Sequence, residues 1–89
     1  MEEWIVVCVD MKARMRIREE NKQYEGVRWL LQAPSSDPHQ FLGFAWKDQF
    51  VSNERLARLA VSPRPGDHIT LYFDRSGAIC KVDVVPAAA

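Results

Sequence analysis

The first fifth of the chain carries an uninterrupted two-residue repeat of apolar side chains. From residue 5 to residue 17 every odd position is apolar or small: Ile5, Val7, Val9, Met11, Ala13, Met15 and Ile17. A helix repeats every 3.6 residues, whereas side chains alternate between the two faces of a strand, so this pattern predicts one long β-strand. Its even positions are apolar at first and become cationic from Lys12 onward. We therefore expect the first half to be buried on both faces and the second half on one, with a bend between them.

A second strand is predicted from Tyr24 to Ala33, after a polar turn at residues 19–22. The register of this hairpin follows from the requirement that the apolar faces of both strands coincide. That condition pairs Met15 with Val27, Ala13 with Trp29, Met11 with Leu31, and Val9 with Ala33. On the solvent face, the same register sets Arg14 opposite Arg28 and Arg18 opposite Tyr24.

The remaining chain predicts three further strands and one short helix. A loop rich in proline and serine at 34–40 precedes a strand at 41–47. Ser52 or Asn53 is a suitable cap for a helix that runs to about Ala60. Two alternating segments at 67–74 and 78–85 predict the last two strands, and residues 86–89 are expected to fray.

The strand predicted at 41–47 has a bulky face and a small face. Leu42, Phe44 and Trp46 form the bulky face, and we expect these side chains in the core. The alternative is that the small residues face inward where a tight barrel is crowded. In that case the bulky side chains form an exposed apolar patch.

The order of elements is strand, strand, strand, helix, strand, strand. A long bent first strand with one helix between the third and fourth strands resembles the OB-fold, a five-stranded, partly closed barrel. We therefore predict a mainly β (α+β) fold: a small OB-like barrel that occupies residues 1–89 as one domain. A single curved sheet with the helix packed on one face has the same element order.

Composition limits the function classes. Twelve lysines and arginines balance twelve acidic residues, so any cationic function must be local. Cys8 and Cys80 lie within apolar runs and are expected to be buried, reduced thiols. The N-terminus lacks the features of a signal peptide, and no apolar run reaches the roughly 18 residues of a membrane span, so we expect a cytoplasmic protein without membrane contact.

No catalytic or metal-binding pattern stands out in the sequence. His39 lies near Ser35, Ser36 and Asp37, but residues of one short loop seldom reach the geometry of a catalytic relay. We expect these side chains to form turns. The sequence therefore predicts a protein that is not an enzyme and has no cofactor and no metal site.

The cationic half of the first strand is the candidate site. In the predicted register like charges oppose one another, which costs up to about 1 kcal/mol per pair, although the chain has enough acidic residues to avoid this. Single-stranded nucleic acid is the favoured ligand because its phosphates match a row of guanidinium groups and its bases can stack on tyrosine. The candidate residues are Lys12, Arg14, Arg16, Arg18, Arg28 and Tyr24. Two alternatives stay open: the row is the solvated face of a half-buried strand, or it contacts a protein partner or a second copy of the chain.

Overall fold

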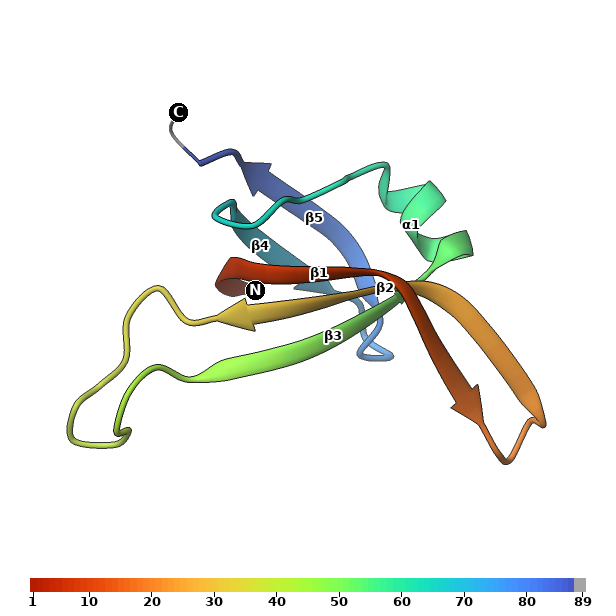
Figure 1. The fold of residues 1–89 in the computed structure, drawn as a ribbon, viewed down its shortest axis with the longest axis horizontal. Helices are drawn as coiled ribbons and strands as arrows, with labels where there is room; N and C mark the ends of the chain where they lie inside the picture. Colours follow the sequence, from red (N-terminus) through yellow and green to blue (C-terminus); the bar gives the residue numbers. More distant parts are fainter. Residues whose placement is uncertain (88–89) are drawn as a thin grey trace.

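Residues 1–87, which the computed structural model describes, form one open antiparallel sheet of five strands with one short helix (Figure 1). The elements are β1 (Glu2–Ile17), β2 (Lys22–Gln32), β3 (Trp46–Ser52), α1 (Asn53–Leu59), β4 (His68–Phe73) and β5 (Ile79–Val85). The strand order is β3-β2-β1-β4-β5, so β3 and β5 are edges and do not pair with each other. The mainly β class and the element order are confirmed, but the sheet is not closed into a barrel.

The inner face of the curved sheet holds the hydrophobic core. Its most deeply buried side chains are Val6, Trp29, Leu31, Val51, Ile69 and Leu71. The predicted helix is confirmed: the Ser52 hydroxyl accepts a hydrogen bond from the Arg55 N–H at 3.3 Å, and Ala60 ends the helix in a left-handed conformation. Leu56 and Leu59 of α1 pack against the core. Arg55 Nη1 also donates to the Ile79 carbonyl at 2.7 Å, which attaches α1 to β5.

The predicted register of the first hairpin was wrong. Met15 lies opposite Tyr24, Ala13 opposite Gly26, Val9 opposite Trp29 and Val6 opposite Leu31. The turn is tighter than predicted, because Ile17 already pairs with Lys22 and Asn21 adopts a positive φ of 49°. Two bulges, between Val6 and Cys8 and between Asp10 and Ala13, then each add one residue to β1 and shift the pairing further.

The predicted bend in β1 is confirmed. Figure 1 shows β1 turning sharply where α1 approaches, so that its second half leaves the sheet together with the start of β2. We call residues 14–25 the hairpin arm. The pairing of β2 with β3 begins at Gly26 and Ser52, so the two strands of the arm pair only with each other.

The predicted strand at 41–47 was also wrong. β3 begins at Trp46, and residues 41–45 form a loop. Leu42, Phe44 and Trp46 are not in the core, because their exposed fractions are 105%, 55% and 72%. Pro34 explains the late start: the Ala33 N–H still donates to the Ala45 carbonyl at 2.8 Å, but the next residue has no N–H with which to continue the ladder.

Both cysteines are exposed, which corrects the expectation of buried thiols. Cys8 directly follows a bulge in β1, and Cys80 is the extra residue of a bulge between β4 and β5. Bulges redirect side chains, so the apolar sequence around each cysteine does not report its burial. At the C-terminus, the Ala87 N–H donates to Asp67 Oδ1 at 3.0 Å, and residues 88–89 of the segment expected to fray lie outside the described residues. Within residues 1–87, no helix combines the length and the apolar character needed to span a lipid bilayer.

Candidate nucleic-acid interface

Side chains along the two strands of the hairpin arm point alternately to its two faces. Arg14 lies opposite Glu25 and Arg16 opposite Gln23, so these four residues share one face of the arm. Met15 and Tyr24 oppose each other on the other face. Arg14 and Arg16 are therefore about 6.6 Å apart along the strand, with guanidinium groups on the same side.

Four of the five candidate cations are free of ion pairs. Lys12, Arg14, Arg16 and Arg18 are all exposed, and in the described part of the chain none of them pairs with a carboxylate. The nearby acidic residues do not neutralise them at contact distance. The Glu20 carboxylate instead accepts a hydrogen bond from the Tyr24 hydroxyl at 3.1 Å. The four cations are thus available to a ligand.

The remaining two candidate residues lie apart from this group. Tyr24 is on the opposite face of the arm from Arg14 and Arg16, and its hydrogen bond to Glu20 raises its pKa above the ordinary value of 10.0. Arg28 lies in the body of the sheet opposite Asp10, and its Nε is 3.1 Å from Asp48 Oδ1. The predicted pair of opposed arginines, Arg14 and Arg28, does not exist. The structure therefore removes the like-charge repulsion on which part of the sequence argument depended.

A second exposed surface lies outside the six candidate residues and is formed by apolar side chains, as the alternative stated for the bulky face has it. We call residues 41–46 the aromatic segment, because Phe41, Phe44 and Trp46 are all exposed together with Leu42. The loop that holds it is ordered by hydrogen bonds: the Phe41 N–H donates to the Asp37 carbonyl at 2.9 Å, and the Ala45 N–H donates to the Ser36 hydroxyl at 2.9 Å. The signal in the sequence that could have revealed this surface is Pro34, which ends the partner strand.

The two surfaces lie far apart on the molecule. The molecule measures 41 × 31 × 26 Å. Figure 1 shows the hairpin arm and the loop before β3 at opposite ends of the longest axis, with β3 running between them. A ligand that contacts both must therefore be elongated.

The loop at 34–40 has a structural role, as its sequence predicts. The His39 N–H donates to Asp37 Oδ1 at 2.9 Å, and Ser36 holds Ala45, so these polar groups stabilise turns. Over residues 1–87, no group of three or more histidine, cysteine, aspartate or glutamate side chains is placed to hold a metal ion.

Comparison with protein-family models, with curated proteins and with solved structures gives no match. The interface is therefore interpreted from its own geometry and chemistry.

Proposed function

We propose that this protein is a non-enzymatic binding module that contacts single-stranded nucleic acid without strong sequence preference. The observation that carries the proposal is the set of four exposed, unpaired cations within seven residues of a chain with no net charge. Phosphate groups bind guanidinium through charge-assisted hydrogen bonds, and binding releases counterions from the nucleic acid. Lys12, Arg14, Arg16 and Arg18 supply these contacts.

The aromatic segment supports the same function. Exposed aromatic rings stack bases with about 1–3 kcal/mol per base, and every base offers a flat face. Trp46 and Phe44 are both more than half exposed, and the loop before β3 lies at the far end of the molecule from the hairpin arm. Tyr24 and Arg28 have smaller roles in this proposal, because Tyr24 faces away from the arm cations and Asp48 already neutralises Arg28.

The proposal includes an OB-like architecture and a cytoplasmic setting. The position of β1 between β2 and β4, with α1 between β3 and β4, supports the OB-like interpretation. Proteins of that architecture bind about 4–16 nucleotides per domain, which agrees with two contact surfaces at the ends of a 41 Å molecule. Two exposed cysteines that are both free support a reducing compartment.

A titration of labelled oligothymidylate, followed by fluorescence anisotropy over a salt series, tests the function. Four phosphate contacts predict that log K falls with log salt with a slope of about 3. The double variant R16Q/R18Q is expected to lower that slope by roughly 1.4. R75Q is the matched control, because Arg75 is an exposed arginine in the turn between β4 and β5. Absence of binding at low salt, or an affinity that does not depend on salt, contradicts the proposal.

Self-association is the second candidate, and the exposure of Leu42, Phe44 and Trp46 favours it. Apolar side chains that project from an ordered loop are typical of a surface that a partner covers. Light scattering over a concentration series separates the two functions. A dimer that L42S/F44S dissociates assigns the aromatic segment to a subunit interface, whereas a monomer leaves it available for bases.

A further inference from the structure

The second bulge of β1 creates a notch at the base of the hairpin arm. A cavity of about 210 Å³ lies there, lined by Met11, Lys12, Ala13, Arg14, Glu25 and Asn53. Two of the four unpaired candidate cations, Lys12 and Arg14, thus line one shared space. We call this cavity the basic notch.

The bulge and a glycine together build this notch. The Lys12 N–H donates to Asp10 Oδ1 at 3.0 Å, which fixes the backbone of the bulge. Gly26 lies opposite Ala13 and pairs with Ser52 on its other side. A Cβ atom at Gly26 would lie 2.0 Å from the Val51 carbonyl oxygen, so glycine permits the close approach of β3. That approach places Asn53, the residue after Ser52, at the wall of the notch.

We propose that the basic notch is a phosphate subsite of the nucleic-acid interface. This inference depends on the proposed function. The Lys12 ammonium and the Arg14 guanidinium supply the charge, and the Asn53 side-chain amide supplies a neutral donor. A cavity of about 210 Å³ has room for the five heavy atoms of a phosphate group.

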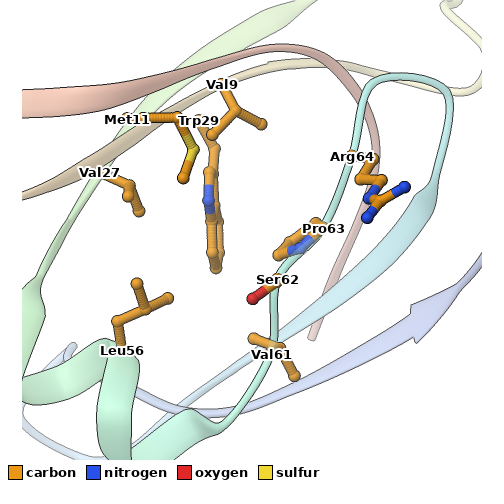
Figure 2. Close-up of a pocket in the computed structure, with 9 residues that line it drawn as sticks. All are labelled: Val9, Met11, Val27, Trp29, Leu56, Val61, Ser62, Pro63 and Arg64. Carbon is orange, nitrogen blue, oxygen red and sulfur yellow. The ribbon is translucent and has the colours of Figure 1, made fainter.

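The neighbouring cavity does not suit a charged group. It has a volume of about 230 Å³ and lies between β1, β2 and α1, with Met11 on its wall (Figure 2). Val9, Val27, Trp29, Leu56 and Val61 contribute most of its wall, and only 1% of the Trp29 surface is exposed. A base cannot stack on a ring that is covered in this way. Arg64 also lines this cavity, but Figure 2 shows its guanidinium group directed away from the centre. The phosphate is therefore assigned to the basic notch alone.

Glu25 provides a variant whose expected change in affinity is opposite to that of the cation variants. Glu25 lines the basic notch and lies opposite Arg14, so its negative charge disfavours a bound phosphate there. Removal of this charge must strengthen binding, whereas removal of either cation must weaken it.

The experiment measures the affinity of the same oligothymidylate for K12Q, R14Q, E25Q and the control R75Q. K12Q and R14Q are expected to weaken binding by about fivefold to tenfold, with a salt slope lower by roughly 0.7. E25Q is expected to tighten binding by about threefold, and R75Q to stay within about twofold of the unmodified protein. Circular dichroism checks that each variant is folded. If the oligonucleotide binds but the notch variants match R75Q, or E25Q does not bind more tightly, the subsite is wrong and the proposed function stands.

A second measurement separates the subsite from the function. Inorganic phosphate is added to the isotopically labelled protein, and the amide resonances of Ala13 and Asn53 are followed by NMR. Shifts that are present in the unmodified protein and absent in K12Q/R14Q support the subsite, even if no oligonucleotide binds and the proposed function fails. If phosphate leaves these resonances unchanged and the notch variants bind oligonucleotide like R75Q, the subsite is overturned.

Discussion

Lys47 shows how a single residue can connect an edge strand to strands that are not its neighbours in the sheet. It lies opposite the buried Leu31, so its side chain enters the inner face of the sheet. Its Nζ is 2.8 Å from Glu2 Oε1, which also accepts a hydrogen bond from Trp4 Nε1 at 3.0 Å. The same Nζ lies 4.8 Å from the centre of the Phe73 ring. One ammonium group thus links β3 to β1 and β4, where no backbone hydrogen bond closes the sheet. An inward charge on an edge strand also discourages pairing with other chains.

Replacement of Lys47 by alanine is expected to lower the free energy of unfolding by about 1–2 kcal/mol, because the charged hydrogen bond and the cation–π contact are both lost. K81A is a close control. Lys81 also lies over an aromatic ring, 5.2 Å from the centre of Tyr72, and pairs with Asp83 at 3.6 Å, but it is exposed and connects neighbours within one hairpin. Its loss should cost no more than about 0.5 kcal/mol. Equal losses in urea denaturation of the two variants would show that Lys47 has no special role.

At the scale of elements, periodicity predicted most boundaries to within a few residues. β1 was expected over 5–17 and spans Glu2–Ile17, and the helix was expected to begin at Ser52 or Asn53 and begins at Asn53. Pairing between strands was not predictable in the same way. A bulge adds a residue without interrupting the apolar alternation, since Val7 and Met11 continue the repeat although they are 53% and 72% exposed. For Lys12, Arg14 and Arg16, the sequence therefore predicted the strand conformation correctly but not the residues that lie opposite them.

The exposure of the bulky side chains at 41–46 also could not be predicted from the local pattern. Alternation of large and small residues at 41–46 is the pattern of a strand, but a strand requires a hydrogen-bonded neighbour. Pro34 removes that neighbour, and the bulky side chains remain in solvent. Exposure depends on what the rest of the chain provides, which a local pattern does not report. The notch at Lys12 and Arg14 depends in the same way on a bulge and on the approach of Asn53 from a distant segment.

The junction of the hairpin arm with the sheet depends on Gly26. Replacement of this residue tests whether β3 must approach β2 closely there. G26A places a methyl group against the Val51 carbonyl oxygen and the Ser52 backbone, so β3 must move away from β2. We expect a loss of about 2–3 kcal/mol or more in the free energy of unfolding, measured by urea denaturation.

Gly43 provides the comparison for this prediction. It has a positive φ of 87° in the loop before β3, and a methyl group added to it would have no other atom within 4 Å. G43A should therefore cost about 1–2 kcal/mol, from backbone strain alone. If G26A is as mild as G43A, the close approach of β3 does not determine the shape of the junction.

At the scale of the whole molecule, three carboxylates hold segments together in their ionised form. A hydrogen bond from Lys47 lowers the pKa of Glu2 below its ordinary value of 4.5. The backbone N–H groups of Arg64 and Ala87 lower the pKa of Asp67, and the hydroxyl of Ser76 with the N–H of Ala78 lowers that of Asp74, both below the ordinary 3.8. Asp67 joins distant parts of the chain, because its carbonyl also accepts the Val6 N–H at 2.9 Å.

These lowered pKa values determine whether the stability of the protein rises or falls as the pH is lowered. A carboxylate with a lowered pKa in the folded state stabilises the protein above its unfolded pKa, and that contribution disappears as the pH falls through the folded value. The melting temperature should therefore be nearly constant down to about pH 5 and decrease below about pH 4.5, as Glu2 and the two aspartates bind protons. D67N should melt below the unmodified protein at pH 7, and the difference should shrink below about pH 4, as the pH falls through the lowered pKa of Asp67. D83N alters an exposed carboxylate of β5 whose pair with Lys81 at 3.6 Å contributes little, so it should melt close to the unmodified protein throughout. A difference between D67N and the unmodified protein that does not change with pH would mean that the charge of Asp67 does not hold the C-terminal segment to the turn before β4.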